Sequence, residues 1–320
     1  FVVGVSAWYL LRRREQQMAR KSIAIASAFG FVFALITAFT GDRSGAIVAR
    51  VQPMKLAAME ALYEGQEGAP LTAVGVLRPE AERTNDEDAF YFKIGIPKML
   101  SLMSFRDADA FVPGIYDLVY GNEERGIMSA AEKIERGRTA VDKQGRCRAA
   151  REAGDTAAFQ VMQSKFDRST PEGEAFLRDH FAYFGYGYLD RPEQIVPNVP
   201  LLFYSFRVMV GAGCFFILLL GVVWWLNRKD RLADKRWLLW VAVWTVPLAY
   251  LASQAGWIVA EVGRQPWAIQ DLMPVGVAAS KIPSGSVSVT FFLFLALFTA
   301  LLVAELSIMF RQIKIGPKND

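Results

Sequence analysis

Four long segments with almost no charged residues constrain the fold of this chain more than any other feature. Residues 22–40, 208–226 and 237–260 carry no charge, and residues 287–310 carry only Glu305. At 1.5 Å per residue, a helix of this length spans a bilayer core of about 30 Å. Hydrophobic residues also make up 53% of the chain. We therefore predict an all-α polytopic membrane protein, a transmembrane helix bundle with a large, mainly helical or irregular extracytoplasmic loop domain.

The basic residues predict how the helices are oriented. Lys and Arg gather in short connections beside the helix ends, and the positive-inside rule places such connections in the cytoplasm. The net charge of +4 therefore indicates membrane topology and no nucleic-acid partner. The predicted spans and their connections are 22–40 (transmembrane), 41–203 (extracytoplasmic loop domain), 204–227, 237–262 and 287–310 (transmembrane), and 311–320 (cytoplasmic tail).

Residues 1–11 form a fifth apolar segment, which is too short to span a membrane. It lacks an initiator Met, and its basic cluster, residues 12–14, follows the apolar stretch, the reverse of a secretory signal peptide. We expect it to be the end of a truncated transmembrane helix, and the chain to be the C-terminal part of a longer protein.

Residues 41–203 are too many for an ordinary connection and predict a functional domain. Within it we expect a helix over 51–64, a loop over 65–85, an extended segment over 90–97 and mostly helix over 130–166.

An aromatic and glycine string at 181–188 allows two interpretations: a ligand platform, or packing of the loop domain onto the membrane surface. The only histidine, His180, stands beside this string, where we expect it to be solvated. Cys147 and Cys214 have no metal-ligand spacing, and we assign neither a redox role.

Candidate chemistry centres on the end of the 237–260 segment. Trp257, Glu261 and Arg264 are spaced i, i+4 and i+7, which predicts one helix face with a π-system, a carboxylate and a cation. If the helix before it runs antiparallel, Arg207 and Met209 lie at the same level. A thioether, a carboxylate, guanidinium groups and a tryptophan match what a buried haem needs.

Simpler interpretations remain for each of these residues. Met209 can fill a core, Arg207 can anchor an interface, and Glu261 can form an ion pair with Arg264. In a second hypothesis the chain is a haem-free transporter or sensor, in which Glu261, Arg264 and Glu305 form a proton or substrate path.

Three groups of motifs carry a resemblance to a known family. They are Gly256-Trp257, Ala260-Glu261 and Gly263-Arg264-Gln265-Pro266-Trp267; Phe206-Arg207-Val208-Met209-Val210; and Val51-Gln52 followed by Lys55-Leu56-Ala57-Ala58-Met59-Glu60. In order and spacing the chain resembles subunit I of the cytochrome bd quinol oxidases, from the end of the fifth helix onward.

The resemblance implies a role for each matching residue. Met209 resembles the methionine ligand of the low-spin b haem, and Glu261 the carboxylate ligand of the high-spin b haem. Arg207 and Trp257 resemble the arginine beside that methionine and the tryptophan between the haems. Lys55 and Glu60 match the loop residues implicated in quinol oxidation. Arg264, in the same motif, is a further expected cofactor-binding residue.

The same resemblance implies a quinol:oxygen oxidoreductase of the bacterial inner membrane, with haem b and haem d, a second large subunit and small single-helix subunits. The family's histidine ligands, on the first and fifth helices, have no counterpart here, because His180 lies in the loop. We therefore expect this chain to be inactive alone.

Overall fold

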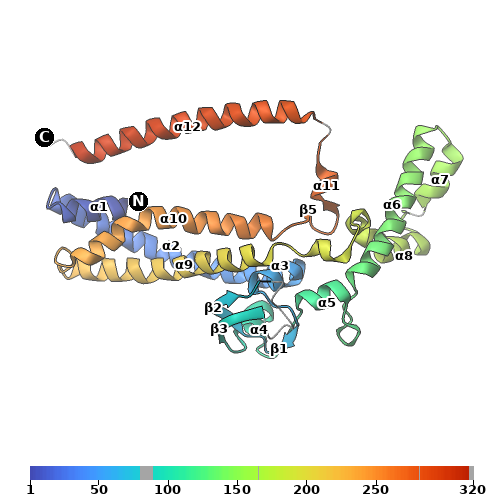
Figure 1. Ribbon diagram of the computed structural model, residues 1–320, viewed down its shortest axis with the longest axis horizontal. Coiled ribbons are helices and arrows are strands. Elements are labelled where there is room, and N and C mark those ends of the chain that lie inside the picture. Colours follow the sequence, from blue (N-terminus) through green and yellow to red (C-terminus); the bar gives the residue numbers. More distant parts are fainter. Residues whose placement is uncertain (80–88, 165, 281, 317–320) are drawn as a thin grey trace. The chain divides into compact units, whose positions relative to one another are not determined.

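The computed structural model describes residues 1–79, 89–164, 166–280 and 282–316. Four helices in this part of the chain are long and apolar enough to cross a membrane, and they coincide with the predicted segments (Figure 1). They are α2 (Gln16–Val51), α9 (Val199–Arg228), α10 (Arg236–Val262) and α12 (Ser284–Ile315). The predicted helical membrane fold is confirmed. Both α2 and α9 extend beyond the charge-free segments.

The chain divides into two compact units. The first, here called the helical unit, comprises residues Phe1–Leu35, Cys214–Tyr250 and Ala279–Asp320. Its core contains side chains of α1 (Val2–Leu11), including Ala7 and Leu10, together with Ile23, Val223 and Leu239. Gly4 brings α1 close to α10, since a Cβ there would lie 3.2 Å from the carbonyl oxygen of Ala242. The short apolar segment at residues 1–11 is thus a helix packed into this core.

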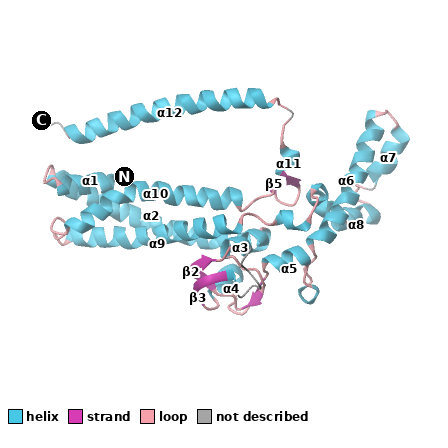
Figure 2. Cartoon of the chain, in the orientation of Figure 1, coloured by secondary structure: helices cyan, strands magenta, loops and turns pink. Residues whose placement is uncertain are grey.

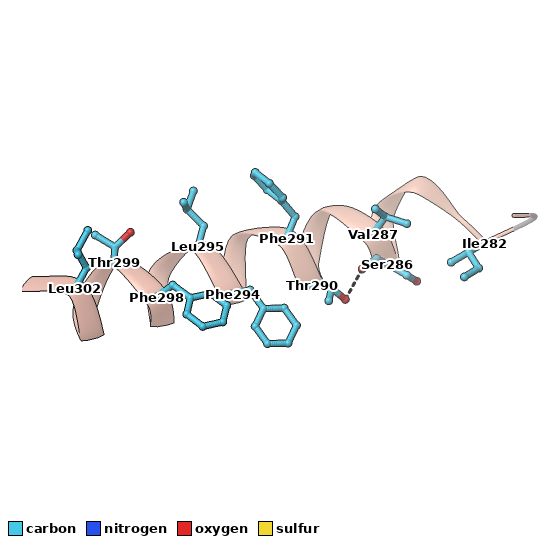
Figure 3. A pocket seen from close by; sticks show the side chains of 10 residues that line it. All are labelled: Ile282, Ser286, Val287, Thr290, Phe291, Phe294, Leu295, Phe298, Thr299 and Leu302. Atoms are coloured by element: carbon cyan, nitrogen blue, oxygen red, sulfur yellow. Dashed lines mark hydrogen bonds between the residues drawn. The ribbon is translucent and has the colours of Figure 1, made fainter. Parts of the chain in front are cut away.

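Helix α12 has no buried residue. The close-up of its apolar face shows Phe294 and Phe298 on one side and Phe291 and Leu295 on another (Figure 3). The rings of Phe294 and Phe298 stack with centroids 5.8 Å apart. At its C-terminal end, the carbonyl of Ile313 accepts a hydrogen bond from the Tyr9 hydroxyl at 2.8 Å. An apolar surface on all sides suits a helix surrounded by lipid or other helices.

The second unit, here called the loop-bearing unit, comprises residues Ile36–Gly213 and Leu251–Ala278. Figure 2 shows short helices and strands in it. The helices are α3 (Pro53–Glu60), α4 (Met99–Phe105), α5 (Ile115–Tyr120), α6 (Ala130–Glu152), α7 (Thr156–Ser164), α8 (Pro171–Asp179) and α11 (Val275–Ala278), with 3₁₀ turns η3 (Glu123–Arg125), η4 (Phe181–Tyr188) and η5 (Pro192–Ile195). Three antiparallel pairs of strands complete it: β1 (Gln66–Glu67) with β4 (Phe111–Val112), β2 (Leu71–Leu77) with β3 (Phe90–Ile96), and β5 (Trp267–Ile269) with β6 (Met273–Pro274).

The predictions for this unit were confirmed in part. The helix predicted over 51–64 is shorter, because α3 begins at Pro53 and ends at Glu60, where Ala61 takes the left-handed conformation. The predicted extended segment is β3, and α6 and α7 lie within the predicted helical region 130–166. The prediction of a loop over 65–85 was wrong for β1 and for β2; residues 80–85 lie outside the described part. β2 was missed because its sequence, LTAVGVL, has no polar and apolar alternation, and only pairing with β3 makes it a strand.

The aromatic string at 181–188 forms η4, and its glycines pack it closely against α6. A Cβ on Gly137 of α6 would overlap the carbonyl oxygen of Tyr183 and lie 2.5 Å from the amide nitrogen of Gly187. A Cβ on Gly187 would lie 2.5 Å from the backbone of Gly137. The string therefore packs the loop-bearing unit internally, through backbone contacts that only glycine permits. Both interpretations of the string, a ligand platform and packing on the membrane surface, stay predictions.

Two glycines on α6 give a matched test of this contact. Gly137→Ala is expected to destabilise the unit by about 1–3 kcal/mol, because the added methyl overpacks backbone atoms that cannot move aside. Gly145→Ala, on the same helix with nothing within 4 Å, is expected to be neutral or to stabilise by up to about 1 kcal/mol. Limited proteolysis of the loop-bearing unit in the two variants measures both effects. Equal resistance of Gly137→Ala and Gly145→Ala to the protease would contradict the proposed packing.

Candidate functional site

Helix α3 positions both loop residues that the sequence singled out. Pro53 is compatible with the first turn of α3, where its missing N–H costs no hydrogen bond. Ala61 ends the helix in the left-handed conformation at φ 49°. Lys55 and Glu60 are five residues apart on α3, about 140° around the helix axis, so they face different neighbours. The resemblance assigned both residues to quinol oxidation, and the structure gives each its own partners.

Glu60 forms a buried ion pair with Arg207 of α9. The Nη2 of Arg207 donates to Oε2 of Glu60 at 2.7 Å, and only 2% of the Glu60 side chain and 13% of the Arg207 side chain are exposed. Arg207 also donates to the carbonyl oxygens of Met59 and, at 2.9 Å, of Thr72. These contacts fix the guanidinium against α3 and β2, although Arg207 and Glu60 are 147 residues apart in sequence.

The β2–β3 hairpin contributes further contacts around this pair. The backbone N–H of Thr72 donates to Oε2 of Glu60 at 3.4 Å, and the N–H of Leu77 donates to the Tyr204 hydroxyl of α9 at 3.0 Å. The rings of Phe90 on β3 and Phe203 on α9 lie 5.5 Å apart. Hydrogen bonds and an aromatic contact thus join the hairpin to the residues that hold Glu60.

One oxygen of Glu60 is left without a partner. Its Oε1 is buried and accepts no hydrogen bond from the described residues, while Oε2 accepts from Arg207 and Thr72. Burial raises the pKa of Glu60, and Arg207 and Lys93 oppose this rise. A buried carboxylate with one free oxygen and a raised pKa has the properties of a proton acceptor.

Lys55 belongs to a second cluster, at the end of α10. Its Nζ donates to the carbonyl oxygen of Ala260 at 3.4 Å, and Gly263 gives its stem room, since a Cβ there would lie 2.9 Å from Cγ of Lys55. Burial and the charge of Arg264 lower the pKa of Lys55, and Glu261 opposes the lowering. Glu261 pairs with Arg264 at 2.5 Å, and each side chain is a little over one-third exposed. Lys55 thus lies within electrostatic reach of both residues.

Arg264 lies outside α10, which ends at Val262. The predicted single helix face with Trp257, Glu261 and Arg264 was therefore wrong for Arg264, which reaches Glu261 from the turn that follows the helix. The Nε of Arg264 is buried and has no hydrogen-bond partner among the described residues. Trp257 is 63% exposed, so its indole is open to a neighbouring molecule.

Met209 of α9 contacts α10 at Gly256. A Cβ on Gly256 would lie 3.0 Å from the sulfur of Met209, so the missing side chain leaves space for the thioether. The carboxylate of Glu261 belongs to a residue five positions further along the same helix, about 7.5 Å in rise. The structure thus brings the thioether of α9 to the helix that carries the carboxylate.

A small cavity of about 10 Å³, close to the volume that a single water molecule needs, lies beside Lys55. Its polar lining comes from Gln52, Gln265 and Gln270, and its apolar lining includes Ile195 and Trp267. It is smaller than a typical ligand pocket of about 300–1,000 Å³. No role was predicted for Gln265, which lies within the 263–267 motif, or for Gln270, three residues after that motif.

The remaining titratable candidates form no further centre. The described residues contain no group of three or more His, Cys, Asp or Glu side chains placed to hold a metal ion. His180 ends α8 and stacks on Phe176 with ring centroids 5.4 Å apart. Cys147 and Cys214 are free thiols. Glu305 is exposed on α12.

Comparison with known proteins identifies the family of this chain. The family model described as cytochrome bd terminal oxidase subunit I matches residues 1–317. The chain belongs to this family. Membership argues against the alternative of a haem-free transporter or sensor, and it supports the resemblance drawn from the motifs.

Individual relatives agree with this membership. The chain is 33% identical over 327 residues to subunit 1 of cytochrome bd-II ubiquinol oxidase of Escherichia coli (strain K12), covering 99% of this chain and 59% of the relative. It is 24% identical to cytochrome bd ubiquinol oxidase subunit 1 of Bacillus subtilis (strain 168), covering 100% of this chain and 54% of the relative.

A solved structure has the same fold. The bd oxidase from Geobacillus thermodenitrificans matches with a TM-score of 0.64 and 24% identity, covering 99% of this chain and 54% of that chain. The chain thus spans between one-half and three-fifths of the length of these relatives.

Proposed function

We propose that this chain forms the quinol-oxidising and haem-binding part of subunit I of a cytochrome bd-type terminal oxidase. One observation supports the proposal most strongly: the buried carboxylate of Glu60 is held by Arg207, which is two residues from Met209 on the same helix. The candidate proton acceptor is thus held by a residue that lies two positions from the candidate iron ligand on α9. The proposed reaction oxidises two quinols to quinones and reduces one O₂ to two waters.

In this proposal Glu60 and Lys55 handle the protons of the quinol. A quinol releases two electrons only as its two hydroxyl protons leave, and the free Oε1 of Glu60 is suited to accept one of them. Lys55, with its lowered pKa, is suited to donate a hydrogen bond to a quinol oxygen from the second cluster. The released protons then leave to the side of the membrane on which the loop lies.

The residues present fit the haems that the family implies. Methionine is an established axial donor to haem iron, and the sulfur of Met209 lies against Gly256 of α10, the helix that carries Glu261. We propose Met209 as the ligand of the low-spin b haem and Glu261 as the ligand of the high-spin b haem. When bound, the haems carry single electrons and, at the oxygen site, reduce O₂.

Two buried guanidinium atoms support anion binding beside these ligands. The Nε atoms of Arg207 and Arg264 have no hydrogen-bond partner among the described residues. A haem propionate would supply the acceptor that each lacks. The exposed indole of Trp257 is proposed to pack between the two b haems.

The wider assignments follow from the family and are proposals for this chain. They are a third haem of type d, with ligands outside this chain; a second large subunit and small single-helix subunits; and a bacterial inner membrane in which residues 41–203 face the periplasm. Lipid surrounds the apolar helices, and no nucleic acid is involved.

Membranes that contain the oxidase with this chain test the proposal. We expect haem bands in the dithionite-reduced minus air-oxidised visible spectrum, together with oxygen uptake on addition of ubiquinol or menaquinol. A featureless spectrum from well-expressed protein would reject the proposal.

A further inference from the structure

We propose that Lys93 of β3 is a positioning residue of the quinol-oxidising site, whose ammonium keeps the carboxylate of Glu60 ionised and ready to accept a proton. This inference rests on the proposed function, since it concerns the environment of Glu60. Nothing in the sequence motifs singles out Lys93, which lies in the hairpin, 33 residues from Glu60 in sequence.

A series of contacts, from one cation across two aromatic rings to a second cation, connects Lys93 with the buried ion pair. The Nζ of Lys93 lies 5.0 Å from the centroid of the Phe90 ring, and the Phe90 ring lies 5.5 Å from that of Phe203. The guanidinium carbon of Arg207 lies 3.7 Å from the centroid of the Phe203 ring. Cations over aromatic rings are attracted by the ring quadrupole. The Phe90 ring therefore favours the ammonium of Lys93, and the Phe203 ring favours the guanidinium of Arg207.

The strand register gives Lys93 its position. Lys93 pairs with Gly75 of β2 in the antiparallel hairpin. A Cβ on Gly75 would lie 3.0 Å from the Phe90 ring and 3.3 Å from the Phe203 ring, so glycine leaves room for the two rings to meet. A side chain at residue 75 would displace the Phe90 ring and, with it, Lys93 on the same strand.

The charges around Glu60 show what Lys93 contributes. Three elements face this carboxylate: Arg207 from α9, the N–H of Thr72 from β2, and Lys93 from β3. Each of the three lowers the pKa of Glu60, against the rise caused by burial. Burial lowers the pKa of Lys93, and the charge of Glu60 opposes this lowering. Arg207 is occupied by Glu60 and three backbone carbonyls, whereas Lys93 is a second, separate cation on β3.

This arrangement predicts how pH affects turnover. Glu60 must be ionised to accept a proton, so activity falls on the acid side as Glu60 becomes protonated. Without the Lys93 charge, the pKa of Glu60 rises further, and the acid limb of the pH–rate profile moves to higher pH. The plateau at alkaline pH, where Glu60 is ionised in both proteins, is unchanged.

The test measures kcat and KM against pH for quinol oxidation by the assembled oxidase. Lys93→Gln and Lys93→Met are expected to move the acid limb of kcat/KM to higher pH and to lower activity several-fold at the midpoint of the parent's limb. Lys93→Arg is expected to restore the parent profile. Lys98→Gln is the matched control, because Lys98 follows the same hairpin and pairs with Asp109 at 2.5 Å at the surface; its profile should equal the parent's.

Two outcomes would overturn the inference. One is an unshifted acid limb in a neutral variant that keeps its haem bands. The other is loss of the haem bands in both neutral variants, which would make Lys93 a folding residue. Failure of the proposed function itself is distinct, because the parent would then show no quinol-dependent oxygen uptake at any pH.

Discussion

Replacement of Glu60 by glutamine is expected to lower the rate of quinol oxidation by about 10²- to 10⁴-fold, the usual contribution of a general base. The amide keeps the shape of the side chain and can still accept a hydrogen bond from Arg207, but it cannot take up a proton from quinol. The measurement is quinol-dependent oxygen uptake by the purified oxidase, with haem content determined in the same sample.

Glu64→Gln is the matched control for this variant. Glu64 lies four residues further along the chain and is exposed, so its replacement should leave turnover within about twofold of the parent, as surface substitutions change free energies by only about 0.5 kcal/mol. Removing one partner of a buried ion pair costs about 3–5 kcal/mol, so Glu60→Gln should also lower thermal stability. Parent-like turnover of Glu60→Gln at all pH values would refute the role of Glu60.

Met209→Leu and Glu261→Ala are expected to remove different haem signals. Leucine is close to methionine in volume, so it fills the space beside Gly256 while lacking the sulfur. Met209→Leu should therefore lose the low-spin b band of the reduced-minus-oxidised spectrum and keep the high-spin signal. Glu261→Ala should lose the high-spin signal and keep the low-spin b band, because it removes the carboxylate and leaves Met209 on α9 unchanged.

Met273→Leu, in the short strand β6 of the same unit, controls for a general effect of losing a thioether. Its spectrum should match that of the parent. A low-spin band that persists in Met209→Leu would disprove the assignment of Met209 as ligand, and a high-spin signal that persists in Glu261→Ala would disprove that of Glu261.

The helical part of this fold could be predicted from sequence because its cause is local. A segment without charges, such as 237–260, must avoid water along its whole length, and α10 follows it closely. The β2–β3 hairpin could not be predicted as well. Its strands are short and apolar, and their pairing depends on contacts with α9 through Phe203 and Tyr204.

The sequence indicated candidate site residues but not their partners. The family resemblance indicated Lys55 and Glu60, and neither it nor the motif spacing gave a reason to join Glu60 to Arg207 or to bring Lys55 to the end of α10. These arrangements depend on how α3 is rotated and on where α10 ends, and neither is encoded in a local pattern. Lys93 was missed for the same reason, since a lysine in an ordinary strand has no signal until the hairpin places it near Glu60.

The most direct test of the central claim, that quinol oxidation at Glu60 supplies electrons to the haems, is anaerobic reduction of the haems by quinol in the parent and in Glu60→Gln. We predict that quinol reduces the b haems of the parent rapidly and those of Glu60→Gln about 10²- to 10⁴-fold more slowly, while dithionite reduces both proteins fully. Equal rates of reduction by quinol in the two proteins would contradict the claim.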